Sequence, residues 1–267
     1  MAITSRQNPL VARYRAAARR AAADELLLDG VHLVGEALSA GVIIRSAAVT
    51  TAAQQQAAIR AIVAVLHRRG VEVAVVSSPV MDAISPVRSA SGIVALAERP
   101  ANSTARLYGG AAPLVMIAID IQDPGNLGAI ARVAEAGGAT GMVAAGVSAD
   151  PFGWKALRGS MGSALRLPLA TREAMEAIAD ARGHACRIVA ATPRGGRSIY
   201  EIDWTGPAAI LLGGEGRGLP PGLADSADER ITIPMQPPVE SLNAAVTAAI
   251  IVYEARRQRA TRIATNP

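Results

Sequence analysis

The chain has 267 residues, which is enough for two domains, and its 51% hydrophobic residues can form a sizeable core. Aromatic residues make up only 3%, so Ala, Val, Leu and Ile must supply most of that core. The single cysteine, Cys186, excludes an intramolecular disulfide and argues against a cysteine-based metal site, while the formal net charge of +5 favours an anionic partner such as nucleic acid.

The three histidines, His32, His67 and His184, are scattered and lack the spacing of metal ligands, so we expect no metal site. The N-terminal residues contain no apolar signal region, and no stretch approaches the ~18–20 uninterrupted apolar residues of a membrane span. We therefore expect a soluble, cytoplasmic protein.

The first hundred residues alternate between strand and helix patterns. Asn8-Pro9 is a helix start, and a basic helix is predicted over residues 10–23. Further helices are predicted at 32–40 and 54–69, and strands at 26–30, 42–50, 71–76 and 91–97. This alternation predicts a compact α/β domain over residues 1–100.

Arginines crowd the N-terminal segment and its first predicted helix. Two interpretations stay open: they contact RNA phosphates, or they form a solvated helix face. The residues concerned are Arg6, Arg13, Arg15, Arg19 and Arg20.

A polar, proline-bearing segment predicts a linker at residues 101–106, and residues 107–267 form the second expected domain. Strands are predicted there at 114–119, 141–145, 187–191, 208–212 and near 231–233. Helices are predicted at 126–137, 154–161, 172–182 and 242–259. Repeated strand–helix alternation predicts an α/β fold with a mostly parallel sheet and helices on both faces.

Three short motifs place polar or glycine residues where an apolar strand gives way to a loop or helix. They are residues 126–132 (NLGAIAR), 212–219 (LGGEGRGL) and 233–245. Ligands of open α/β sheets bind at the edge where such loops meet, so the motifs predict one composite site. The glycine motif has neither the dinucleotide-binding spacing nor the ending of a P-loop, and its glycines more simply let the backbone approach a flat ligand.

Several of the polar motif residues also have a purely structural interpretation. Asn126 could be a helix cap, Arg132 an exposed helix residue, and Ser241 the cap of a last helix with Asn243 in its first turn. Glu215 could contact a ligand or brace its loop by accepting backbone N–H groups; bracing is the interpretation that we favour.

In their order and intervals, the three motifs resemble the SpoU (TrmH-like) group of the SPOUT superfamily, which are knotted RNA ribose 2′-O-methyltransferases. Residues 158–168 also resemble a family segment, and residues 3–9 and 89–95 resemble the family's N-terminal RNA-substrate-binding domain. The resemblance implies a deep trefoil knot near the C-terminus, S-adenosylmethionine as the cofactor bound in it, and a homodimer formed through the C-terminal domain.

The resemblance also implies roles for individual residues. Arg132 would act at the ribose hydroxyl from the neighbouring subunit, Asn126 and Asn243 would orient groups, and Ser241 would help to place the methyl donor or Arg132. The implied catalytic set is Asn126, Arg132, Glu215, Ser241 and Asn243, and the implied cofactor set is Thr192, Leu212, Gly213, Gly214, Ile233, Met235 and Leu242. RNA contacts are expected from the N-terminal arginines and from Arg158.

The expected activity is methylation of a ribose 2′-hydroxyl in structured RNA, and the full N-terminal domain favours rRNA. The alternatives are a tRNA substrate, an antibiotic-resistance methylation of rRNA, and a non-catalytic RNA-binding or ribosome-assembly protein of the same fold. Leu28-Asp29-Gly30 stands where the family usually has Val-Glu-Gly, and Trp154 stands where a small or polar residue is common. Both departures bear on the RNA rather than on the chemistry.

Overall fold

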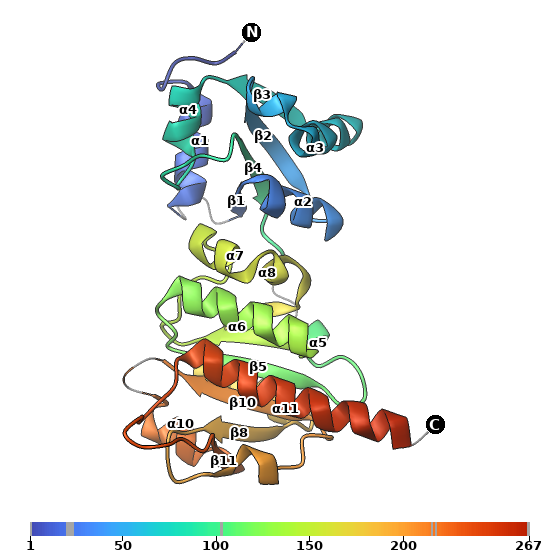
Figure 1. The fold of residues 1–267 in the computed structure, drawn as a ribbon, viewed down its shortest axis with the longest axis vertical. Helices are drawn as coiled ribbons and strands as arrows, with labels where there is room; N and C mark the ends of the chain where they lie inside the picture. The colour runs from blue at the N-terminus through green and yellow to red at the C-terminus, as the bar shows by residue number, and fades with distance from the viewer. Residues whose placement is uncertain (1, 20–23, 102–103, 215, 217, 266–267) are drawn as a thin grey trace. The chain divides into compact units, whose positions relative to one another are not determined.

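A computed structural model of the chain describes residues 2–19, 24–101, 104–214, 216 and 218–265, with the side chains described up to residue 261 (Figure 1). The chain forms two compact units: residues 1–101 together with 152–166, and residues 102–151 together with 167–267. Residues 152–166, from within the expected second domain, thus pack with the first unit. No helix in the described part of the chain has the length and apolar character needed to cross a membrane.

The first unit is built on a four-stranded sheet with the order β1-β4-β2-β3. Its strands are β1 (Glu25–Asp29), β2 (Ile44–Thr50), β3 (Glu72–Val76) and β4 (Ile93–Glu98). Helices α1 (Pro9–Ala18) and α4 (Ser78–Ile84) cover one face, and α2 (Val31–Ser39) and α3 (Ala57–Arg68), which follows the short η1 (Ala53–Gln55), cover the other (Figure 1). The strands and helices predicted for residues 1–100 all occur here, and α4 is an addition.

The basic helix α1 starts where the sequence predicts, because the Asn8 side chain accepts the Leu10 N–H at 2.9 Å and Pro9 occupies the first turn. It ends at Ala18, earlier than the predicted residue 23, and residues 20–23 lie outside the described chain. Val11, Tyr14 and Ala17 form its buried face, at helical spacing. The same unit contains α7 (Trp154–Ser160) and α8 (Ser163–Arg166).

The second unit contains a seven-stranded sheet with the order β7-β6-β5-β10-β8-β11-β9, in which all paired strands are parallel. The prediction of a mostly parallel α/β sheet is confirmed. The strands are β5 (Leu114–Ile119), β6 (Gly141–Ala145), β7 (Leu169–Arg172), β8 (Arg187–Ala191), β9 (Arg197–Ser198), β10 (Ala208–Gly213) and β11 (Glu229–Thr232).

Helices cover both faces of this sheet, as its apolar strands require. Helices α6 (Pro124–Gly137) and α11 (Ala244–Thr265) lie side by side on one face (Figure 1). Helices α5 (Thr104–Leu107) and α9 (Ala174–Gly183) pack on the other face, with α10 (Pro221–Asp225) beside it and η2 (Ile199–Glu201) after β9. All six residues of β5 are buried, which is typical of a parallel strand covered on both sides.

The sheet order creates a switch point at the carboxyl end of β5. Strands β6 and β7, which follow β5 in the chain, lie to one side of it, whereas β10 and β8 lie to the other. Loops that leave neighbouring strands in opposite directions open a crevice, and this is where open α/β sheets bind ligands. The fold therefore brings the three motifs to one edge of the sheet.

Two expectations about helix caps are wrong. The cap of α6 is Asp123, whose carboxylate accepts the Asn126 N–H at 2.8 Å, so Asn126 lies inside the first turn. The cap of α11 is Asn243, whose Oδ1 accepts the N–H groups of Ala245 and Val246 at 2.9 and 3.3 Å. Ser241 precedes the helix by three residues, and residues 241–243 form no regular secondary structure.

Candidate active site

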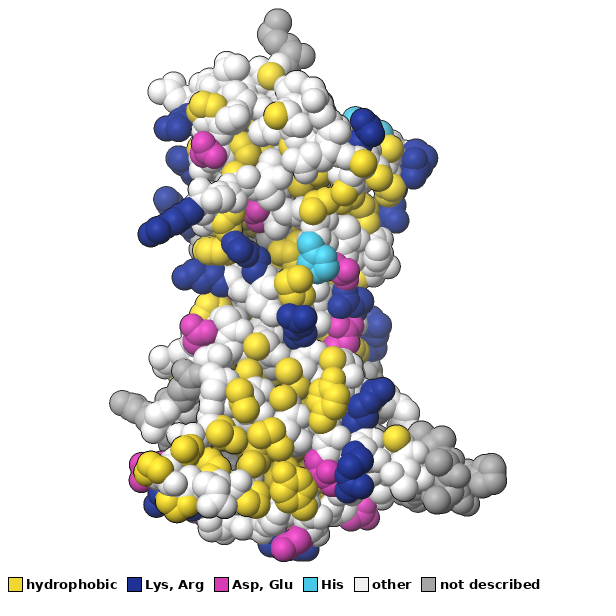
Figure 2. All heavy atoms as spheres, viewed as in Figure 1, with side chains coloured by type: hydrophobic (Ala, Val, Ile, Leu, Met, Phe, Trp, Pro, Cys, Tyr) yellow, Lys and Arg dark blue, Asp and Glu magenta, His cyan; other side chains and the backbone are white. Residues whose placement is uncertain are grey.

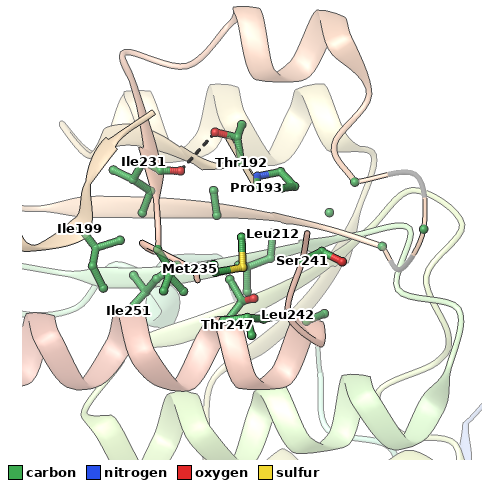
Figure 3. A pocket seen from close by; sticks show the side chains of 17 residues that line it. Thr192, Pro193, Ile199, Leu212, Ile231, Met235, Ser241, Leu242, Thr247 and Ile251 are labelled. Atoms are coloured by element: carbon green, nitrogen blue, oxygen red, sulfur yellow. Dashed lines mark hydrogen bonds between the residues drawn. The ribbon is translucent and has the colours of Figure 1, made fainter. Parts of the chain in front are cut away.

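A pocket opens at the carboxyl ends of β8, β10 and β11 and is closed by the start of α11 (Figure 3). It encloses a cavity of about 140 Å³ and has about 780 Å³ of empty space when its open mouth is included. Its lining consists of Ala191, Thr192, Pro193, Ile199, Leu212, Gly213, Gly214, Gly216, Gly218, Ile231, Ile233, Met235, Ser241, Leu242, Ala244, Thr247 and Ile251.

The pocket is mostly apolar with a few polar groups at its walls. The side chains of Leu212, Met235 and Ile251 lie around its centre, whereas Thr247 and Ser241 supply hydroxyls (Figure 3). The ends of β8 and β11 are held together because both the backbone N–H and the hydroxyl of Thr192 donate to the Ile231 carbonyl, at 2.9 and 3.2 Å. An apolar slot with backbone and hydroxyl groups at its edges suits a flat ligand with hydrogen-bonding groups on its rim.

The glycine loop after β10 leaves no room for a side chain at its first two positions, Gly213 and Gly214. A Cβ atom on Gly213 would overlap the backbone of Gly218, and one on Gly214 would overlap the carbonyl oxygen of Asp120. Gly216 and Gly218 have φ angles of 82° and 64°, a region that favours glycine. The loop backbone therefore forms one wall of the pocket. Glu215 lies outside the described residues.

The first and third motifs meet through two side chains. Asn243 Nδ2 donates to Asn126 Oδ1 at 3.1 Å. The cap geometry fixes the Asn243 amide, because its oxygen accepts two helix N–H groups and its nitrogen must therefore face Asn126. This links the amino-terminal ends of α6 and α11 next to the pocket.

Two segments of the chain match known protein families. Residues 113–253 match the SpoU rRNA Methylase family, and residues 11–95 match the MRM3-like substrate binding domain. The chain belongs to the SpoU rRNA methylase family.

Three relatives match this SpoU protein over nearly its whole length. An uncharacterized tRNA/rRNA methyltransferase of Synechocystis is 32% identical over 96% of this chain and 94% of its own. The 23S rRNA (guanosine(2553)-2′-O)-methyltransferase RlmP of Bacillus subtilis is 27% identical over 89% of this chain and 90% of its own. The crystal structure of an AdoMet-bound rRNA methyltransferase from Sinorhizobium meliloti superposes with a TM-score of 0.85 at 29% identity, covering 96% of this chain and 97% of that one.

The structure brings most of the predicted site residues together. All seven predicted cofactor residues line the pocket: Thr192, Leu212, Gly213, Gly214, Ile233, Met235 and Leu242. Ser241, from the predicted catalytic set, lines it as well. Asn126 and Asn243 form the pair described above. Arg132 lies exposed on α6, and within the described residues no hydrogen bond or ion pair joins its side chain to the others.

Sequence reasoning missed six pocket residues that lie outside the motifs: Ala191, Pro193, Ile199, Ile231, Thr247 and Ile251. Thr247 and Ile251 lie four positions apart on α11 and therefore on one face, so helical periodicity could have pointed to them. Ile199 belongs to η2, a single turn after the two-residue strand β9, and so short an element leaves no periodic signal.

The N-terminal arginines make contacts within their own unit. Arg13 forms an ion pair with Glu25 at 2.5 Å, and that partner raises the pKa of Arg13. Arg6 and Arg15 donate from Nε to the carbonyls of Pro79 and Ala83, at 3.1 and 2.8 Å. These contacts hold α1 and the segment before it against β1 and α4. Neither of the two open interpretations, RNA contact or a solvated helix face, included this structural role. Arg19 and Arg158 are exposed, and Arg20 lies outside the described residues.

Other candidate groups fit structural roles. Cys186 is buried, and burial raises the pKa of its thiol, which keeps the thiol protonated and unreactive. Within the part of the chain that the structure describes, no group of three or more His, Cys, Asp or Glu side chains is arranged to hold a metal ion.

Proposed function

We propose that this protein transfers a methyl group from S-adenosylmethionine to a ribose 2′-hydroxyl of ribosomal RNA. One observation carries the proposal: residues of the second and third motifs converge on a single apolar pocket, and the Asn126–Asn243 pair links the first motif to it. The relatives support the same activity, since RlmP is named as a 23S rRNA 2′-O-methyltransferase and the Sinorhizobium structure is AdoMet-bound.

The chemistry of the pocket suits S-adenosylmethionine. The adenine ring is flat and apolar with hydrogen-bonding edges, which suits the slot between Leu212, Ile233 and Met235. Gly213, Gly214, Gly216 and Gly218 line the pocket, so backbone groups of the glycine loop lie at its wall and can serve those edges. When bound, this cofactor supplies a methyl group on a sulfonium centre, which makes it ready for transfer. We further propose that the polypeptide around the pocket forms the trefoil knot of the family.

The chain's own residues have to orient the ribose hydroxyl and assist the loss of its proton. A guanidinium stays protonated near neutral pH and is a poor base, so Arg132 serves better by holding a phosphate and the hydroxyl in place. Asn126 and Asn243 fix the ends of α6 and α11, and Ser241 contributes a hydroxyl at the pocket wall. In this scheme Glu215 braces the glycine loop.

The proposal includes a homodimer in which Arg132 acts on the ribose bound at the partner's pocket. Hydrophobic side chains gather on the face of the second unit that α6 and α11 form (Figure 2). Val246 and Tyr253 are large hydrophobic residues that stay 46% and 51% exposed on α11, seven positions apart and hence on one side of the helix. A second copy that covers this face would bury them and would bring its own α6 close.

The RNA partner is assigned to rRNA because the substrate-binding domain match covers residues 11–95 and the full-length relative RlmP is named for 23S rRNA. Arg19 and Arg158 are exposed and would bind RNA phosphates. Arg6 and Arg15 use their Nε groups within the protein and have further N–H groups that would donate to phosphates. Because its proposed substrate is ribosomal RNA, we propose that the protein works in the cytoplasm.

Calorimetric titration with S-adenosylmethionine tests the first step. We expect saturable binding at one site per chain, with loss of affinity in a Leu242→Glu variant that puts a charge into the pocket. A silent titration of the well-folded wild-type protein would favour the non-catalytic RNA-binding alternative.

A further inference from the structure

Asp120 has an unusual backbone conformation at the switch point of the sheet. It follows β5 directly, and its φ angle is 56°, in the left-handed region. Among the described non-glycine residues only Asp120, Met161 and Ala185 have positive φ angles, and aspartate is one of the few side chains that tolerate this region. A left-handed residue at a ligand-binding edge is a reason to ask what its conformation achieves.

The side chain of Asp120 ties the end of β5 to the loop that follows β6. Its Oδ1 accepts the Val147 N–H at 2.9 Å, and its own N–H donates to the Ala145 carbonyl at 3.2 Å. Gly146 makes room for the carboxylate, because a Cβ atom there would overlap Asp120 Oδ1. Ser148 adds to this connection by accepting the Ile121 N–H at 3.0 Å.

The backbone of Asp120 supports the glycine loop on the other side. Gly214 lies so close that a Cβ atom on it would overlap the Asp120 carbonyl oxygen. Gly213 and Gly214 are also part of the pocket wall. The direction of the Asp120 peptide therefore limits where the glycine loop can lie, and with it the width of the pocket.

We infer that Asp120 is a positioning residue for the methyl-transfer reaction, which holds the glycine loop in the path that the cofactor pocket requires. The inference rests on the proposed function. It assigns two separable tasks to one residue: a left-handed backbone that leaves space for Gly214, and a carboxylate oxygen that fixes this backbone through the Val147 N–H.

Four variants separate these tasks. Asp120→Asn keeps both the tolerance for a left-handed backbone and an acceptor for Val147, so S-adenosylmethionine affinity should stay within about twofold of wild type. Asp120→Gly keeps the backbone and loses the acceptor, and should weaken binding moderately. Asp120→Ala loses both and should weaken binding roughly tenfold, because alanine disfavours the left-handed backbone conformation. Gly214→Ala should weaken binding similarly, because it creates the same clash from the opposite side.

Ala185→Val is the matched control for strain. Ala185 also has a φ angle of 56°, but it lies between α9 and β8. This is the amino-terminal end of β8, whereas the pocket lies at the carboxyl ends of the strands. A β-branched residue there should lower the melting temperature and leave cofactor affinity unchanged. Binding is measured by calorimetry on samples whose circular dichroism shows native folding, so that a loss of folded protein is not counted as a loss of affinity.

The inference is overturned if Asp120→Ala binds S-adenosylmethionine as the wild type does, or if Asp120→Asn is as weak as Asp120→Ala. If the wild type itself neither binds the cofactor nor transfers methyl groups, the proposed function fails instead. The two failures are therefore distinguishable.

Discussion

Asn243 and Asn126, which are 117 positions apart in the chain, are joined by a hydrogen bond from Nδ2 to Oδ1 of 3.1 Å. Asn243 also caps α11, so one side chain both starts the last helix and holds the first motif. This double role holds the segment before α11, which lines the pocket, at a fixed position relative to α6, the helix that contains Arg132.

Substitutions at the two asparagines should therefore have different effects on stability. Asn243→Ala should lower the free energy of unfolding by about 1 kcal/mol through loss of the cap, whereas Asn243→Ser should keep much of the cap but cannot reach Asn126. Asn126→Ala should leave stability nearly unchanged, because Asp123 caps α6. Urea unfolding measures these differences.

Methyl transfer should fall in all three asparagine variants, and cofactor affinity should persist in Asn126→Ala. Retained activity in Asn243→Ser would show that the side-chain pair has no part in the reaction.

Arg132→Ala should abolish most methyl transfer and leave the dissociation constant for S-adenosylmethionine unchanged, because Arg132 is exposed on α6 and does not line the pocket. Co-expression can then test which subunit the arginine serves. A heterodimer of Arg132→Ala with Leu242→Glu should be active, since one intact pocket receives Arg132 from the partner. Both homodimers should be inactive. An inactive heterodimer would mean that Arg132 acts within its own subunit.

Among the N-terminal arginines, Arg19 is the better candidate for an RNA contact than Arg13, whose guanidinium is paired with Glu25. Arg19→Gln should flatten the log–log salt dependence of RNA binding by roughly 0.7 to 0.9, the effect of one lost phosphate contact. Arg13→Gln should change the slope less and the stability more. If neither variant alters the slope, RNA recognition must come from elsewhere, and Arg158 would be the next residue to test.

Glu254 on α11 gives the fold a defined response to acid. Hydrogen bonds from Arg257 at 2.9 and 2.8 Å, and from Gln258 at 2.8 Å, hold the pKa of this carboxyl below its usual value. A lowered carboxyl pKa contributes stability above the unfolded-state pKa, and this contribution disappears as the pH falls through the lower folded-state value. Glu254→Gln should therefore reduce stability at pH 7 and flatten its decline between about pH 5 and the acid limit.

The matched control is Glu72→Gln, which removes an exposed carboxylate at the start of β3. Its pH profile is the baseline against which the Glu254→Gln profile is compared. Parallel profiles for wild type and Glu254→Gln would contradict the assignment.

The sequence predicted the fold where its signals are local and strong. The unbroken apolar run of β5 and the Asn8-Pro9 start of α1 are readable directly, because buried parallel strands and helix starts have short-range chemistry. The short strands β7 and β9 and the helices α5, α8 and α10 were not predicted, since elements of two to five residues carry no periodicity.

The site was predictable as far as its motifs extend. The glycines and the apolar residues of the second and third motifs indeed line the pocket. The contribution of Ile199, the left-handed backbone of Asp120 and the contacts of Arg6 and Arg15 with distant carbonyls could not be predicted, because each depends on which segments the folded chain brings together.

Methylation of a ribose in ribosomal RNA can be measured directly. Ribosomal RNA from cells that lack the gene is incubated with the purified protein and methyl-labelled S-adenosylmethionine, and the product is then hydrolysed with alkali. A 2′-O-methyl group removes the hydroxyl that alkaline cleavage needs, so the label should appear in an alkali-resistant dinucleotide, and the Arg132→Ala protein should give none. Label in methylated-base mononucleotides, or in tRNA but not in rRNA, would contradict the assignment.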